Sequence, residues 1–133
     1  MSAPSHPVAF VIEDDKNLSV AFTEAMKSAA YQVVTIRNGL EAIARLKTEV
    51  PATIVLDLHV PGVNGVDILH YIRDDARFKN VKVIVTTADD RKAEELRELA
   101  DLVLIKPIGL QQLRDMAVRM HPDTVQTSKI EDQ

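Results

Sequence analysis

The fold is decided first by the stretch Val8-Ala-Phe-Val-Ile12, which runs straight into Glu13-Asp14-Asp15. Four more short apolar runs follow along the chain, and stretches of helical spacing separate them. Most runs are nearly continuous in apolar residues, which is typical of parallel strands covered by helices on both faces. The predicted strands are 8–12, 32–36, 53–56, 81–85 and 102–105.

The segments between these runs carry apolar residues at the spacing of amphipathic helices. Asn38-Gly39 forms the turn into the second helix, and Asp67 lies in the first turn of the third, where the helix dipole favours an anion. The fourth helix is predicted over 90–99. Strict alternation predicts an α/β, flavodoxin-like, doubly wound (βα)5 fold with a parallel five-stranded sheet of order 2-1-3-4-5. The apolar stripes are Leu18, Phe22, Ala25, Ala29; Leu40, Ile43, Leu46; Val66, Leu69, Ile72; Ala93, Leu96, Leu99 or Ala100; and Leu110, Leu113, Ala117, Met120.

Composition narrows the class of protein. A chain of 133 residues suits one domain, predicted over 8–121 between tails at 1–7 and 122–133. The net charge of −4 argues against direct binding of nucleic acid through phosphate contacts. Without cysteine there are no disulfides and no zinc–thiolate sites. No apolar run approaches the roughly 20 residues that span a bilayer, so we expect a cytoplasmic protein without membrane contact.

Polar residues follow four of the predicted strands. In open α/β sheets, ligands bind beyond the carboxyl ends of the strands. We therefore expect carboxylates, a hydroxyl and an ammonium to converge at one edge of the sheet. The strands end on Glu13-Asp14-Asp15, on Asp57, on Thr86-Thr87 and on Lys106-Pro107.

Such a cluster has a specific chemistry. Carboxylates this close repel each other unless a cation lies between them. Oxygen ligands without His or Cys select Mg²⁺ or Mn²⁺, and Mg²⁺ leaves positions for a phosphate. Lys106 could neutralise phosphoryl oxygens and Thr87 could donate a hydrogen bond to them. Asp57 needs no general base to attack phosphorus, because an aspartate is already an anion at pH 7. The product would be an aspartyl phosphate.

With these residues in place, about residues 8–121 resemble the receiver domain of two-component response regulators. Four ordered motifs carry the resemblance. They are Val11-Ile-Glu-Asp-Asp15; Ile54-Val-Leu-Asp-Leu58 followed by Pro61-Gly62 and Asn64-Gly65; Val85-Thr-Thr-Ala88; and Ile105-Lys-Pro107.

The resemblance implies a metal site. Asp57 resembles the phosphoacceptor, which also binds the metal. Asp14 resembles the direct metal ligand, Glu13 acts mainly through water, and the backbone carbonyl of His59 resembles the third protein ligand. Asp15 is expected to cap the first helix instead of binding metal.

The resemblance also implies a switch. Thr87, not Thr86, resembles the switch hydroxyl, because the small residue Ala88 follows it. Lys106 resembles the family's lysine, whose bond to the following proline is commonly cis. Two features depart from the family pattern. Val103 stands where many receivers have Tyr or Phe, and the fourth helix is short and charged, which puts the usual output surface in doubt.

The implied function is a phosphorylation-controlled switch. A sensor histidine kinase or histidine phosphotransfer protein would supply the phosphoryl group to Asp57. The chain would then dock on a downstream target protein or pass the group on, as a monomer or a weak phosphorylation-dependent homodimer. It would not be an enzyme beyond its own phosphorylation and dephosphorylation.

Three alternatives remain open. A non-phosphorylated interaction platform would explain Val103 and the short fourth helix. A hydrolase acting through an aspartyl phosphate would place a second Asp two residues after the nucleophile, where this chain has His59. A flavin module is disfavoured, because the acidic loop after the first strand would repel the FMN phosphate.

Overall fold

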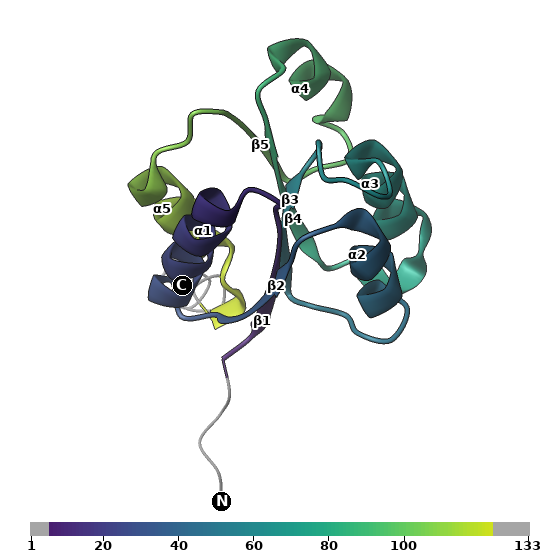
Figure 1. Ribbon diagram of the computed structural model, residues 1–133. Helices are drawn as coiled ribbons and strands as arrows, with labels where there is room; N and C mark the ends of the chain where they lie inside the picture. Colours follow the sequence, from purple (N-terminus) through teal and green to yellow (C-terminus); the bar gives the residue numbers. More distant parts are fainter. Residues whose placement is uncertain (1–5, 124–133) are drawn as a thin grey trace, which may run out of the picture.

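The computed structural model describes residues 6–123 and shows a parallel five-stranded sheet with helices on both faces (Figure 1). The strand order β2-β1-β3-β4-β5 confirms the predicted fold. Most of the predicted tails 1–7 and 122–133 lies outside the described residues. The strands are β1 Val8–Ile12, β2 Gln32–Ile36, β3 Thr53–Asp57, β4 Lys82–Thr87 and β5 Leu102–Ile105.

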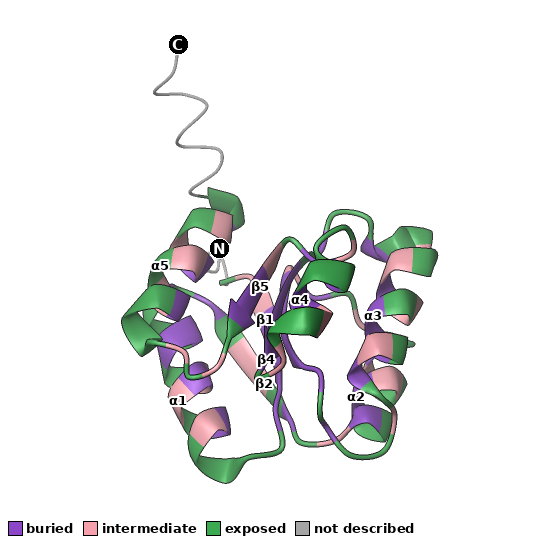
Figure 2. Cartoon of the chain, turned by 90° about the horizontal axis from the view of Figure 1, so that it is seen from above, coloured by how far each residue is buried: buried purple, intermediate pink, exposed green. Residues whose placement is uncertain are grey.

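The helices form two outer layers. Helices α1 and α5 pack side by side on one face of the sheet, and α2 and α3 cover the other (Figures 1 and 2). The short α4 packs against β4 and β5. None of the helices within residues 6–123 has the length and apolar character needed to cross a membrane. The helices are α1 Lys16–Ser28, α2 Gly39–Leu46, α3 Gly65–Asp74, α4 Asp90–Leu96 and α5 Leu110–Met120, with a 3₁₀ turn, η1, at Ala76–Phe78.

Side-chain caps fix where α1, α2, α3 and α4 begin. The Asp15 carboxylate accepts from the N–H of Leu18 at 2.9 Å, which confirms that Asp15 caps α1. Asn38 and Asn64 cap α2 and α3 in the same way. Each cap satisfies a backbone donor that the first helical turn leaves free. The helices that follow β1 and β3 therefore start at defined positions beside the carboxyl ends of those strands.

The central strands bury side chains on both faces, which explains their nearly continuous apolar sequence (Figure 2). On one face, Val11, Val55, Ile84 and Leu104 pack in the core beneath α1 and α5. On the other face, their neighbours Ile12, Leu56, Val85 and Val103 pack in the core beneath α2, α3 and α4. Alternation along the strands therefore assigns each residue at the strand ends to one face.

Three predicted elements have other bounds in the structure: β3, which ends at Asp57 and not at residue 56, α4 and β4. Helix α4 ends at Leu96 instead of Leu99, because the N–H groups of Leu99 and Ala100 both donate to the Leu96 carbonyl at 3.0 Å and close a turn. The Leu99 carbonyl then accepts from Arg73 Nε on α3 at 2.6 Å, outside any helix. Strand β4 begins at Lys82 and continues through Thr87, so both threonines belong to the strand and not to the loop after it.

Candidate functional site

Three carboxylates meet at the carboxyl ends of β1 and β3. One oxygen each of Glu13, Asp14 and Asp57 lies within 4.8 Å of the other two. Glu13 and Asp57 are buried, with 1% and 3% of their surface exposed, whereas Asp14 faces solvent. The sheet thus brings together acidic residues 43 or 44 positions apart in sequence into a cluster that is open on one side.

Lys106 is the cation of this cluster. Its Nζ lies 3.2 Å from Glu13 Oε1 and 3.4 Å from Asp57 Oδ2. The N–H of Lys106 donates to the Thr87 carbonyl at 2.8 Å, which fixes the lysine to the end of β4. The bond between Lys106 and Pro107 is cis, as expected.

Asp57 is held at both carboxylate oxygens. The N–H of His59 donates to Oδ1 at 3.1 Å, and Lys106 contacts Oδ2. The donor in this hydrogen bond is the His59 backbone, and the His59 side chain is exposed. The role of the His59 carbonyl as a metal ligand stays a prediction.

Burial, together with the hydrogen bond and negative charge of Asp57, raises the pKa of the Glu13 carboxyl to about 7. The N–H of Asp15, which donates to Glu13 Oε2 at 3.1 Å, and the Lys106 ammonium act in the opposite direction. Burial would lower the pKa of Lys106, but the carboxylates of Asp57 and Glu13 outweigh it and raise this pKa. The Lys106 ammonium thus contacts two of the three carboxyl groups, and the cluster favours a further positive charge.

The two threonines of β4 differ in their hydrogen bonds. Thr87 Oγ1 accepts from the N–H of Asp89 at 3.0 Å, and Asp89 caps α4 by accepting from Arg91. Thr86 lies directly beside Asp57 in the sheet register. Its Oγ1 is buried and has no hydrogen-bond partner within residues 6–123.

Comparison with known proteins identifies the family. Residues 9–118 match the family model of the response regulator receiver domain. The chain belongs to this family. The receiver domain is 30% identical over 128 residues to the phosphate regulon transcriptional regulatory protein PhoB of Rhizobium meliloti, covering 91% of this chain but only 56% of that relative. It is 29% identical over 92 residues to the polar-differentiation response regulator DivK of Brucella anthropi, covering 68% of this chain and 75% of DivK.

Solved structures support the same assignment. The chemotaxis response regulator CheY4 of Vibrio cholerae superposes with a TM-score of 0.78 over 87% of this chain and 99% of CheY4, and its 20% identity shows the fold alone. The Mn²⁺-bound form of response regulator Rcp1 is 27% identical, with a TM-score of 0.71 over 84% of this chain and 89% of Rcp1. In this receiver domain of two-component signalling, the acidic pocket of Glu13, Asp14 and Asp57 fits Mg²⁺ and an aspartyl phosphate.

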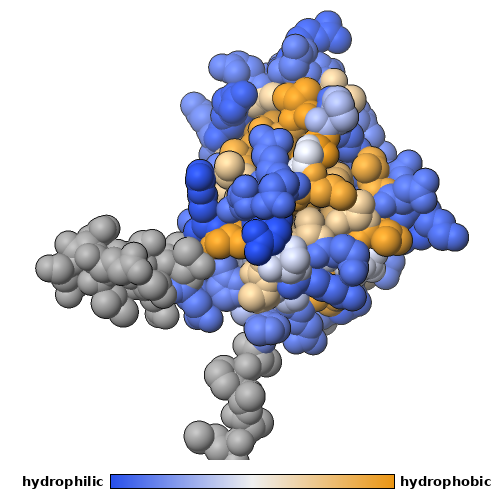
Figure 3. Space-filling view, turned by 90° about the vertical axis from the view of Figure 1, so that its left-hand side faces the viewer, coloured by the Kyte–Doolittle hydropathy of each residue, from blue (hydrophilic) through white to orange (hydrophobic). Residues whose placement is uncertain are grey.

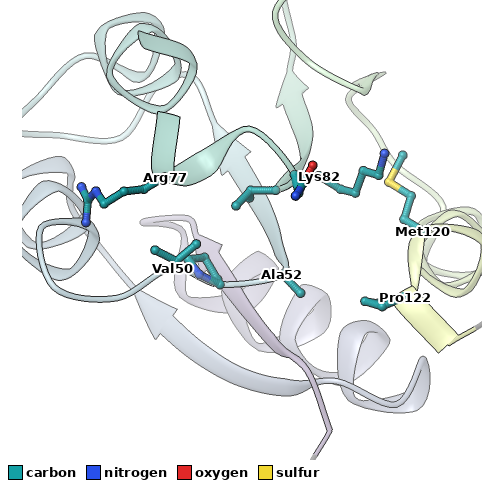
Figure 4. Close-up of a pocket in the computed structure, with 9 residues that line it drawn as sticks. Val50, Ala52, Arg77, Lys82, Met120 and Pro122 are labelled. Atoms are coloured by element: carbon teal, nitrogen blue, oxygen red, sulfur yellow. The ribbon is translucent and has the colours of Figure 1, made fainter. Parts of the chain in front are cut away.

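The donor set supports a hard divalent cation. The clustered carboxylates offer oxygen atoms only, and they lie close enough together for their negative charges to favour a bound cation. By contrast, a cavity of about 440 Å³ lies at the opposite end of the sheet, where the strands begin (Figure 4). Its lining includes Ala52, Val81 and Lys82, next to the first residues of β3 and β4. That cavity is remote from the carboxylates and plays no part in the site.

Glycines let the loop after Asp57 pack tightly beside the site. A Cβ on Gly65, at the start of α3, would lie 2.5 Å from the Cα of Leu58. A Cβ on Gly39, at the start of α2, would lie 2.4 Å from the Val63 carbonyl oxygen. The N–H of Gly39 also donates to the Pro61 carbonyl at 2.7 Å. The turn residues of the second motif, together with Gly39, therefore fix the position of the segment that carries His59.

Sequence reasoning missed two contributors to the site. Arg37, directly after β2, donates from Nη2 to the Asp14 carbonyl at 2.9 Å and so holds the loop that presents Asp14. Its position after a strand at the same edge of the sheet could have revealed it. Thr86 was set aside in favour of Thr87, and its register beside Asp57 is seen only in the pairing of β3 with β4.

Proposed function

We propose that this receiver domain accepts a phosphoryl group on Asp57 from a sensor histidine kinase or a histidine phosphotransfer protein. It then signals by phosphorylation-dependent binding of a target protein or by passing the group on. The observation that carries this proposal is the arrangement around Asp57. Its carboxylate is buried among oxygen donors, with Lys106 at one oxygen and the N–H of His59 at the other.

Different side chains of the site have different roles in the proposed in-line transfer of the phosphoryl group. An oxygen of Asp57 attacks phosphorus and forms an O–P bond, while the P–N bond of the phosphohistidine donor breaks. The electron pair of that bond stays on the departing imidazole nitrogen, and a donor ring that carries a proton on its other nitrogen leaves as neutral imidazole. Lys106 stabilises the negative charge on the phosphoryl oxygens, and Thr87 turns its hydroxyl towards them.

Asp14, Asp57 and Glu13 would hold Mg²⁺ or Mn²⁺, together with the backbone carbonyl of His59. When bound, the ion supplies positive charge that draws the donor's phosphoryl group to the cluster and neutralises it there. The exposed position of Asp14 keeps one side of the cluster accessible to the donor.

A protein donor fits the surface around the site better than a small phosphate ester does. Ile105 and Leu110 flank Lys106 in sequence and are 38% and 45% exposed, and Val20 is exposed on α1. Seen from the side of α1 and α5, the surface shows apolar groups among hydrophilic ones (Figure 3). Apolar side chains at the rim of the site can pack against a helical partner that presents a phosphohistidine.

The output would start at Thr87. Its hydroxyl now accepts from Asp89, and Asp89 caps the short helix α4. If Thr87 turns towards a phosphoryl group, this bond to Asp89 breaks and the start of α4 is free to move. Val103, which is buried in the core of the same face, has no ring that could follow the threonine. The proposed signal is thus a change in the segment from Thr87 to α4.

Intact-protein mass spectrometry after incubation with phosphoramidate tests the proposal. The wild type should gain one phosphate in the presence of Mg²⁺ and none after chelation. Asp57→Asn should gain none, whereas Asp67→Asn, which changes an exposed carboxylate on α3, should be labelled normally. Full labelling of Asp57→Asn would refute the assignment. A folded wild type that binds Mg²⁺ but gains no phosphate would favour the interaction platform, which Val103 and the short α4 also support.

A further inference from the structure

Thr86 carries a buried hydroxyl that lacks a hydrogen bond in the described part of the chain. The residue is fully buried near the carboxyl end of β4. A buried hydroxyl without a partner lowers stability, and a valine of the same shape would avoid this loss. A functional role would explain why a threonine occupies this position.

Thr86 lies in the row of side chains that forms the site. In the parallel register, Asp57 on β3 pairs with Thr86, and Thr86 pairs with Leu104 on β5. Register partners in a parallel sheet point to the same face, and Leu104 packs beneath α1 and α5. Thr86 therefore shares its face with Asp57 and lies one strand nearer to β5.

The side chain of Lys106 has to pass over this position. Lys106 directly follows β5, yet its ammonium contacts Asp57 on β3 and Glu13 after β1. Because β4 lies between β5 and β3, the lysine crosses β4 on the face where Thr86 lies. An ammonium has three N–H donors, and in the described residues Glu13 and Asp57 account for two. A donor to spare and an acceptor without a partner thus lie on the same face, on adjacent strands.

We propose that Thr86 is a positioning residue for Lys106, a role that rests on the proposed phosphorylation of Asp57. Before transfer, two carboxylates hold the ammonium. When an oxygen of Asp57 forms its bond to phosphorus, negative charge moves from that carboxylate to the phosphoryl oxygens. The Thr86 hydroxyl, turning to another staggered χ1 position, accepts the third N–H and holds the ammonium beside the phosphoryl group.

The test compares rates of phosphate addition from phosphoramidate at saturating Mg²⁺. In this step the O–P bond to Asp57 forms, the P–N bond breaks, and the amine leaves as ammonia with the electron pair and a proton. Thr86→Val should be labelled about tenfold more slowly, the change expected for losing one hydrogen bond to a charged group. Thr86→Ala should be slowed similarly, and Thr86→Ser should stay close to the wild type.

Urea unfolding separates this role from a purely structural one. Thr86→Val should be more stable than the wild type, although it is labelled more slowly. Thr53→Val is the matched control, because Thr53 donates to the Tyr31 hydroxyl at 3.1 Å at the other end of the sheet. That variant should lose stability and keep its labelling rate.

The outcomes separate the two proposals. If Thr86→Val and Thr86→Ala are labelled at the wild-type rate, the positioning role is wrong and phosphorylation of Asp57 stands. A Thr86→Ser variant as slow as Thr86→Val would also overturn it, because the hydroxyl would then not be the group that matters. If the wild type takes up no phosphate, phosphorylation itself fails, and the role of Thr86 fails with it.

Discussion

Raising the pH should destabilise the metal-free chain through one residue, Glu13. Burial, together with the neighbouring Asp57, raises the pKa of this carboxyl from 4.5 to about 7. A raised pKa means that the folded state binds the proton more tightly than the unfolded state does. The contribution of Glu13 to the free energy of unfolding is therefore fully present below a pH of about 4.5. It is lost as the pH rises through about 7.

The two pKa values give the size of the effect. With a pKa of about 7 in the folded state and 4.5 in the unfolded state, the free energy of unfolding falls by about 2 kcal/mol between about pH 5.5 and about pH 8. Lys106 does not contribute to this change in the free energy of unfolding. Its raised pKa lies above 10.5, so its own contribution stays constant there.

Urea unfolding followed by circular dichroism, in the presence of a chelator, measures this loss. Glu13→Gln is the reference, because glutamine cannot ionise at this position. The wild type should lose about 2 kcal/mol relative to Glu13→Gln over the window, and millimolar Mg²⁺ should restore stability at the alkaline end. Parallel profiles for the two proteins would show that Glu13 does not titrate in this range and would refute the reasoning.

Two further substitutions test packing, Gly65→Ala beside the site and Arg73→Ala at the other end of the sheet. Gly65→Ala should cost about 1–3 kcal/mol of stability in urea unfolding, because its Cβ would meet the Leu58 backbone at 2.5 Å. Gly109→Ala is the control: its nearest contact would be at 3.8 Å, so its stability should stay within about 0.5 kcal/mol of the wild type. Arg73→Ala should lower the free energy of unfolding by about 1–3 kcal/mol, because Arg73 donates to the Leu99 and Val81 carbonyls and pairs with Asp101. If urea unfolding is unchanged, these bonds make no net contribution to stability.

Local patterns predicted most of the fold because the strands of this sheet are apolar on both faces. Once β1, β3 and β4 are recognised as buried parallel strands, the residues after them must meet at one edge. The end of α4 could not be predicted in this way. The apolar spacing continues to Leu99, and only the contact of Arg73 with the Leu99 carbonyl, 26 residues away in sequence, shows that this carbonyl is bonded outside the helix.

The site was predictable as a set of residues but not as a set of contacts. The convergence of Glu13, Asp57 and Lys106 follows from the strand ends, and the structure places them within ion-pair distance. Whether a hydroxyl finds a partner depends on neighbours from other strands. Thr86 and Thr87 are neighbours on one strand, yet Thr87 accepts a hydrogen bond and the Thr86 hydroxyl has no partner within residues 6–123.

A divalent cation bound at this site would compete with the proton on Glu13, because both compensate the negative charge of the same carboxylates. In the metal-free chain the buried Glu13 holds a proton up to a pH of about 7, because burial and the neighbouring Asp57 disfavour its ionised form. A bound divalent cation favours the ionised form, so its binding must release that proton wherever Glu13 is still protonated. The apparent affinity for Mg²⁺ should therefore fall as the pH drops below about 7, and labelling of Asp57 at limiting Mg²⁺ should fall with it. The burial of Glu13 beside Asp57 thus predicts that the proposed phosphorylation of Asp57 depends on pH.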